Sequence, residues 1–181
     1  MVVVLLVIAV VGAGFIWIYN ALVSDRNQVK AAWSDIDVQL VRRHDLLPQL
    51  VTTVKAYAAH EKATLLAVTE LRTRSEAAKH LPQKAAVEAE VEQALHNLIV
   101  VAEAYPQLKA DQNFLQLQRD LVAIEDHIQY ARRFYNGAVR IFNTRIQSFP
   151  HLLLAQPMGF RAAEYFEVDA DQRGPVKVEL S

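Results

Sequence analysis

The chain has 181 residues, about the length of one domain, and its 19 Lys and Arg residues nearly balance 20 Asp and Glu residues, for a formal net charge of −1. It lacks the basic excess typical of nucleic-acid binders, so nucleic acid is not an expected partner. Cysteine is absent, which excludes disulfides and thiol chemistry, and the scarcity of Gly (5) and Pro (6) favours long helices over a turn-rich β fold.

The first 19 residues, MVVVLLVIAVVGAGFIWIY, carry no charged side chain. As a helix they would cover about 28 Å, close to the roughly 30 Å hydrocarbon core of a bilayer. Trp17 and Tyr19 close the run with side chains that favour the membrane interface. A cleaved signal peptide is the alternative, but it would begin with basic residues and have a shorter apolar run. We therefore expect a retained transmembrane anchor over residues 1–19.

Flanking charge predicts the orientation of this anchor. No basic residue precedes it, whereas Arg26 and Lys30 follow closely, so the positive-inside rule places the N-terminus outside and the rest of the chain in the cytoplasm. The expected location is the bacterial cell (inner) membrane, with a single pass. Four small residues within the run would let two anchors approach closely, or are ordinary lipid-facing residues: Ala9, Gly12, Ala13 and Gly14.

Beyond the anchor, apolar residues recur at alternating spacings of three and four, which predicts amphipathic helices. The expected helices span about 20–45, 48–78, 82–105 and 111–149. Pro48 separates the first two, because proline removes a backbone donor and clashes with the preceding turn, and Asp45 is the expected N-cap of the second. Pro82 opens the third helix, Pro106 closes it, and Asp111 caps the last.

None of these helices could bury its apolar stripe alone. The sequence therefore predicts an all-α fold, an N-terminal transmembrane helix followed by an up-and-down four-helix bundle over residues 20–149, with coiled-coil-like packing. No Gly or Pro separates Tyr19 from Val29, so we expect one continuous helix to leave the bilayer. Residues 150–181 form a short irregular tail, docked by Phe160 and Phe166. We expect its end to be mobile after Glu167, or to form a marginal strand through Val176, Val178 and Leu180.

No catalytic, cofactor or metal site is evident in the sequence. The six histidines lack zinc-motif spacing, since His60-Glu61 is followed at the required position by Thr64, and the Glu-x-x-His pair of di-iron bundles is missing. Glu92 and His96 lie four residues apart, which predicts a surface contact. There is also no Gly-rich phosphate loop and no nucleophile elbow. We expect a protein that is not an enzyme and needs no cofactor.

Two polar clusters interrupt the helices. The first is Arg42, Arg43, His44 and Asp45, and the second is Arg132, Arg133, Tyr135 and Asn136. Arg43 occupies a stripe position, so it must be paired or reach out to solvent. A buried ion network that fixes helix register is the favoured interpretation, with partners among Asp35, Asp37, Asp45, Glu125 and Asp126. A docking patch for an acidic partner or anionic head groups is the alternative. Tyr135 is expected to make a core hydrogen bond.

Several stretches together resemble the LemA family. They are residues 19–61 (YNALVSDRNQVKAAWSDIDVQLVRRHDLLPQLVTTVKAYAAHE), 102–118 (AEAYPQLKADQNFLQLQ), 131–150 (ARRFYNGAVRIFNTRIQSFP) and the GF and FE pairs at 159–160 and 166–167. Val41 and Gln49 depart from the usual family residues. The resemblance implies a small helical bundle of bromodomain-like topology on one membrane anchor. It also implies association of some relatives with a membrane zinc metalloprotease and of one branch with magnetosome membrane formation.

Three functions follow as hypotheses. The favoured one is a non-enzymatic scaffold that forms a homo-oligomer and organises or shapes the lipid bilayer. The second is an adaptor or regulator of a membrane zinc metalloprotease. The third, against which the histidine spacing argues, is a metal-binding or enzymatic bundle.

Overall fold

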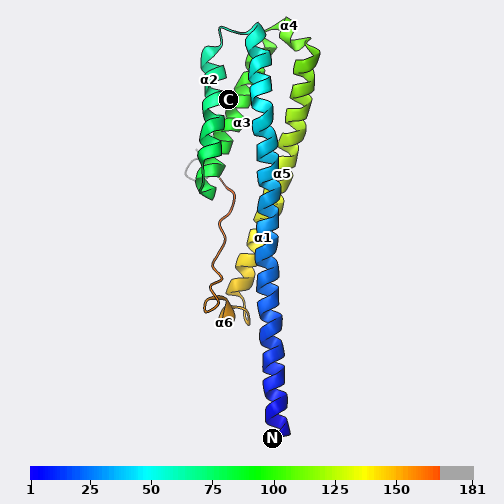
Figure 1. The fold of residues 1–181 in the computed structure, drawn as a ribbon, viewed down its shortest axis with the longest axis vertical. Helices are drawn as coiled ribbons and strands as arrows, with labels where there is room; N and C mark the ends of the chain where they lie inside the picture. The colour runs from blue at the N-terminus through cyan, green and yellow to red at the C-terminus, as the bar shows by residue number, and fades with distance from the viewer. Residues whose placement is uncertain (168–181) are drawn as a thin grey trace, which may run out of the picture. The chain divides into compact units, whose positions relative to one another are not determined.

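A computed structural model describes residues 1–167, and within that range the chain is all-α, with no strand. Figure 1 labels the helices in chain order. They are α1 (Val2–Tyr57), α2 (Lys62–Ala77), α3 (Leu81–Glu103), α4 (Pro106–Lys109), α5 (Gln112–Gln147) and α6 (Leu152–Ala155). The all-α prediction is confirmed. The expected strand and mobile end of the tail lie outside the described residues.

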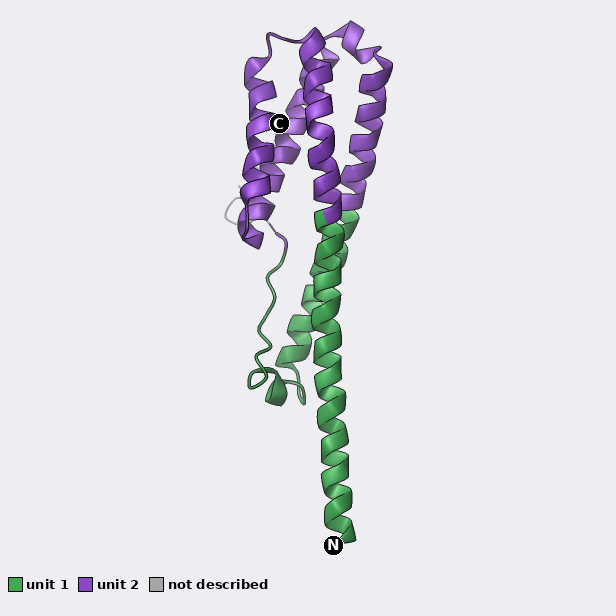
Figure 2. Ribbon diagram, in the orientation of Figure 1, with its two compact units in different colours: residues 1–37, 129–165 green, residues 38–128, 166–181 purple. Residues whose placement is uncertain are grey.

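The chain divides into two compact units (Figure 2). Among the described residues, unit 1 comprises residues 1–37 and 129–165, and unit 2 comprises residues 38–128, 166 and 167. The long helices α1 and α5 each contribute a segment to both units. Each unit therefore has its own packing.

The start of α1 is apolar and uncovered. Every residue from 1 to 13 is exposed, including Leu5 at 62% and Ile8 at 61%. Among the described residues, α1 is the helix long and apolar enough to cross a membrane. So many exposed apolar side chains are unfavourable in water and become favourable when lipid covers them. The helix then continues without a break past Tyr19, as the absence of Gly and Pro there predicted.

The predicted helix boundary at Pro48 is wrong. α1 runs through Pro48 to Tyr57, and Asp45 is therefore an exposed residue inside a helix rather than the N-cap of a new one. Loss of the proline hydrogen bond costs about 3 kcal/mol, but Leu47 and Leu50 on either side are each 1% exposed. Burying such a side chain contributes about 1.5–3 kcal/mol, so packing of this stripe outweighs the local defect.

The other predicted helices agree more closely with the structure. The predicted ranges 82–105 and 111–149 are observed as α3 and α5, each within two residues of the expected bounds. The backbone N–H of Phe114 donates to the Asp111 carboxylate over 2.9 Å, which confirms the N-cap of α5. The predicted helix 48–78 is instead divided at residues 58–61, where α1 ends and α2 has not begun.

Unit 2 buries one apolar core formed by the stripes of its helices. Its members come from α1, α2, α3, α4 and α5, and most are less than 5% exposed: Leu47, Leu50, Val54, Ala58, Leu65, Val68, Val91, Ala94, Leu95, Leu98, Ala102, Leu108, Phe114 and Leu121. Residues spaced by threes and fours supply these side chains, as in other helix bundles. The polar cluster described below continues these stripes at one end of the core, where Arg43, Glu88 and Glu125 follow Leu47, Val91 and Leu121 at spacings of three and four.

Unit 1 holds the tail against α1 and α5. Phe160 is 5% exposed, and its ring lies 6.1 Å from that of Tyr19 and 6.4 Å from that of Phe142. Gly159 has φ +75°, a left-handed conformation that other residues adopt only with strain, and it turns the chain into this contact. Phe166, in unit 2, is also 5% exposed. Both phenylalanines that were expected to dock the tail are therefore buried.

Candidate functional site: a buried ion network in unit 2

A charged cluster lies inside unit 2, where apolar side chains would be expected. Arg43 projects from α1 at a core-facing position of the helix stripe and is 0% exposed, and its neighbour His44 is 6% exposed. Glu88 of α3 and Ser75 of α2 are each 0% exposed as well. Burial of an unpaired ion in a protein interior costs several kcal/mol, so these groups must be paired.

Every long helix of the unit contributes to the pairing. Arg43 Nη1 donates to Glu125 Oε1 of α5 over 2.7 Å, and its Nη2 donates to Glu88 Oε2. Ser75 Oγ donates to Glu88 Oε1, and His44 Nε2 lies 3.3 Å from the same oxygen. Glu88 is thus the centre of the cluster, since it contacts groups from both α1 and α2. The prediction that Arg43 must be paired is confirmed.

These contacts hold the cluster in its ionised form. Burial by itself would raise the pKa of Glu88, but hydrogen bonding from His44, the charge of Arg43 and the Ser75 hydroxyl together lower that pKa to about 2. Burial likewise opposes the charge of Arg43, and the carboxylates of Glu125 and Glu88 outweigh it and raise the Arg43 pKa. Arg43 and Glu88 are therefore both charged at neutral pH.

This arrangement is suited to fixing the positions of the helices. A carboxyl with a pKa of about 2 cannot supply a proton at neutral pH, and at 0% exposure neither Glu88 nor Arg43 is accessible to a substrate. Within residues 1–167 no group of three or more His, Asp and Glu side chains is placed to hold a metal ion. A guanidinium that bridges two carboxylates constrains the register of the helices that carry them.

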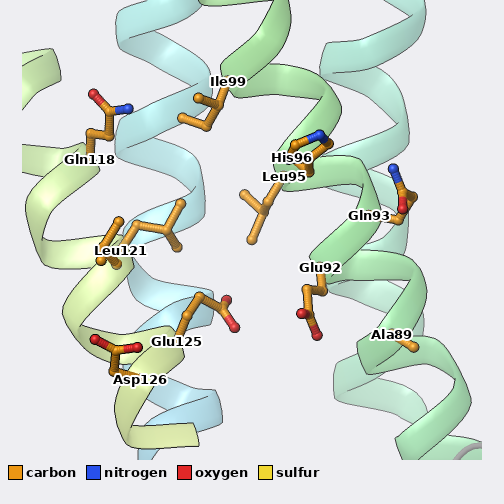
Figure 3. Close-up of a pocket in the computed structure, with 11 residues that line it drawn as sticks. Ala89, Glu92, Gln93, Leu95, His96, Ile99, Gln118, Leu121, Glu125 and Asp126 are labelled. Atoms are coloured by element: carbon orange, nitrogen blue, oxygen red, sulfur yellow. The ribbon is translucent and has the colours of Figure 1, made fainter. Parts of the chain in front are cut away.

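A groove beside the network connects it to the surface. It lies between α3 and α5, has a volume of about 690 Å³, and Leu95 and Glu125 point into it from its two sides (Figure 3). Glu92 and Asp126 supply acidic groups at its rim. Glu125 uses Oε1 for Arg43, while its Oε2 is buried without a hydrogen-bond partner. The groove therefore has an apolar floor and an acidic border.

The two clusters predicted from the sequence differ in their placement. Of the first, Arg43 and His44 enter the buried network, whereas Arg42 and Asp45 are exposed. Of the proposed carboxylate partners, Glu125 is a partner of Arg43. The residues of the second cluster, 132–136, belong to unit 1.

Within the second cluster, Tyr135 is buried and its hydroxyl donates to the carbonyl of Glu164 over 2.9 Å, which confirms the expected core hydrogen bond. The Arg133 guanidinium stacks on the ring of Tyr130 at 4.6 Å. Arg132 and Asn136 are half-buried.

Ser75 and Glu88 were not predicted from the sequence, although their positions in the helix stripes carried a signal. Glu88 lies within the buried series Ala85, Glu88, Val91, Leu95, Leu98 and Ala102, spaced by threes and fours. Ser75 holds the matching place in the α2 stripe Leu65, Val68, Leu71, Ser75 and Ala78. A polar residue inside an apolar stripe indicates a buried partner, as Arg43 did.

At the membrane segment, Trp17 is 64% exposed and contacts His151, and Tyr19 is 37% exposed. Of the small-residue patch, Ala9, Gly12 and Ala13 are exposed and Gly14 is half-buried. A Cβ added at Gly12 or Gly14 would meet nothing within 4 Å. This face therefore has room for a neighbouring helix or for lipid.

Comparison with known proteins agrees with the sequence motifs. The model of the LemA family matches residues 32–180, most of the chain. The chain belongs to the LemA family. It is 28% identical over 159 residues to Protein LemA of Metamycoplasma hominis, a match that covers 84% of this chain and 73% of that protein.

Two magnetosome proteins are further LemA-like relatives. The chain is 29% identical over 175 residues to Magnetosome protein MamQ 2 of Paramagnetospirillum magneticum, and 27% identical over 174 residues to Magnetosome protein MamQ of Magnetospirillum gryphiswaldense. Each match covers 82% of this chain and 64% of the relative. The chain thus spans less than two thirds of the length of the MamQ relatives.

Proposed function

We propose that this LemA protein is a non-enzymatic, single-pass membrane protein that self-associates and thereby organises or shapes the bilayer, with its helical bundle on the cytoplasmic side. Two features support the location: the exposed apolar start of α1, and Arg26 and Lys30, which follow it. The buried ion network supports the absence of catalysis, because its charges are occupied with one another.

The observation that carries self-association is an apolar seam on α5 within unit 1. Tyr130, Phe134 and Ile141 are 66%, 53% and 49% exposed, and with Gly137 they follow spacings of four, three and four. This is the spacing by which helices of two chains interlock. A Cβ added at Gly137 would meet nothing within 4 Å, so a second helix has room to approach closely there.

The mass of the full chain in lipid nanodiscs, and cross-linking in liposomes, test this proposal. We expect an oligomer for the wild type and a monomer for Phe134→Glu, because a carboxylate in the seam would be desolvated by the second copy. Leu66→Glu on α2 is a matched control, since Leu66 is 66% exposed and lies outside the seam. A wild type that remains monomeric in lipid would refute the proposal.

The α3–α5 groove favours a second candidate function, an adaptor for a membrane protease. Its apolar floor and acidic rim complement a basic amphipathic helix of another protein. Recovery of a membrane metalloprotease with tagged wild type from native membranes, and its loss with Val122→Arg, a groove residue that is 58% exposed, would support this function. Recovery of no protease under conditions that retain native lipids would remove it.

A further inference from the structure

The turn that follows α5 leaves large apolar side chains uncovered. Phe149 is 76% exposed, Leu153 is 60% exposed, and Leu152 and Met158 are each 42% exposed. All four fall within ten residues, in a segment that contains the short helix α6. Several exposed apolar side chains in one segment indicate a surface that contacts a membrane or another protein.

Within unit 1 this turn packs against α1 where the apolar run ends. The ring of His151 lies 5.7 Å from that of Trp17, and the ring of Phe160 lies 6.1 Å from that of Tyr19. Trp and Tyr at the end of a membrane span favour the lipid head-group layer. A segment that contacts these two rings lies at the same depth along α1.

A basic groove adjoins the exposed turn. It has a volume of about 410 Å³ and is lined by Arg140, Ile141, Thr144, Arg145, Ser148, Phe149 and His151. Arg140 is exposed, and Arg145 uses Nε for the carboxylate of Asp25, 2.7 Å away. His151 Nε2 is buried without a hydrogen-bond partner. The groove thus presents two guanidinium groups, one of them partly neutralised by Asp25, beside an exposed phenylalanine.

We propose that the turn at residues 148–158 is a second membrane contact, in which the side chains of Phe149, Leu152 and Leu153 enter the head-group layer while Arg145, at the end of the groove nearest the turn, binds the phosphate of an anionic phospholipid. The proposal rests on the membrane anchoring proposed above. An amphipathic segment with apolar groups beside arginine is the composition that binds at such interfaces, and guanidinium groups match phosphate geometry.

This contact would give the protein two attachments to one leaflet. A single helix is free to tilt and rotate in the bilayer, whereas interfacial anchors beside it restrict both motions. The turn would therefore set the orientation of α1 in the membrane, and the tilt and rotation of α1 would depend on the charge of the lipids.

Insertion of the turn can be measured directly because the chain has no native cysteine. Full-length Leu153→Cys labelled with the fluorophore NBD, in vesicles of phosphatidylcholine and phosphatidylglycerol with nitroxide-labelled lipids, is expected to be quenched several-fold more than Lys30→Cys. Lys30 is an exposed residue of α1 about 20 Å beyond Trp17 at 1.5 Å per residue, and is the water-exposed control within unit 1. Ile8→Cys, inside the apolar run, reports whether the anchor is inserted in the bilayer.

The three positions separate the two proposals. Quenching at Ile8 and Leu153 but not at Lys30 supports both. If Ile8 is quenched while Leu153 matches Lys30, the second contact is refuted and the anchor stands. If Ile8 is not quenched, membrane anchoring fails and the second contact fails with it.

The lipid specificity is tested by comparing vesicles with and without phosphatidylglycerol. For wild type, we expect at least a two-fold gain in Leu153 quenching when phosphatidylglycerol is added to phosphatidylcholine vesicles, with no effect of added inorganic phosphate. Arg145→Gln should remove most of this gain, and Arg140→Gln should not, because the contacts of Arg145 with Asp25 and of Tyr135 with Trp33 place Arg140 at about the level of Lys30. Equal quenching in both vesicle types, or an equal loss in the two variants, would refute head-group binding in the groove. Competition by inorganic phosphate would show a site for the free anion instead.

Discussion

Replacement of Glu88 by Gln tests whether the ion network holds unit 2 together. Gln keeps the shape of the side chain but removes its charge, so Arg43 would retain Glu125 as its remaining carboxylate while still 0% exposed. Removal of one member of a buried ion pair costs about 3–5 kcal/mol. Native domains are stable by about 5–15 kcal/mol, so this change is expected to remove a large share of the free energy of unfolding.

The pKa of Glu88 gives the same magnitude independently and adds a pH dependence. Its folded value of about 2 lies below the ordinary value of 4.5, which corresponds to about 3 kcal/mol at about 1.4 kcal/mol per pH unit. Because the folded pKa is lowered, this stabilisation is fully present above pH 4.5 and is lost as the pH falls through about 2. The stability difference between wild type and Glu88→Gln should therefore be largest at neutral pH and shrink toward pH 2.

The assay is chemical denaturation of the full chain in detergent micelles, followed by circular dichroism between pH 2 and pH 7. Glu90→Gln is the matched control, because Glu90 pairs with Arg74 over 2.8 Å but both side chains are about half exposed. Exposed pairs contribute less than about 1 kcal/mol, so this control should change little at any pH. If the two variants lose equal stability at pH 7, or if the difference between wild type and Glu88→Gln does not change with pH, the network is not what stabilises the unit.

Three further changes probe other contacts. Arg43→Met should lower the free energy of unfolding by about 3–5 kcal/mol, because Glu88 is left buried without its cation. In a double-mutant cycle measured by denaturation, the variant with both Arg43→Met and Glu88→Leu should lose less stability than the sum of the two single variants. Asp111→Ala should lower the free energy of unfolding by about 1 kcal/mol through loss of the α5 N-cap, whereas Asp111→Asn should retain most of it. Tyr135→Phe should lower the free energy of unfolding by about 1 kcal/mol, because the carbonyl of Glu164 loses its hydrogen-bond donor. The tail should then be cleaved faster in limited proteolysis, and an unchanged cleavage rate would contradict a role of Tyr135 in holding it.

The candidate site was only half predictable from the sequence. Arg43 was identifiable because it interrupts an apolar stripe, and a buried guanidinium requires a carboxylate. Its main partner, Glu88, is 45 residues away on another helix, and periodicity within one helix does not give the rotation of that helix against its neighbours. The sequence therefore indicated that a partner existed, but the packing of α1 against α3 selected which one.

Features of the fold that depend only on residues close together in the chain could be predicted from the sequence. Nineteen uncharged residues, stripes spaced by threes and fours, and an aspartate before α5 were enough to predict the apolar start of α1, the all-α fold and the Asp111 cap. The tertiary structure decided where α1 ends. Pro48 disfavours a helix locally, yet Leu47 and Leu50 gain more from burial than the missing hydrogen bond costs, and that gain exists only when the other helices are in place.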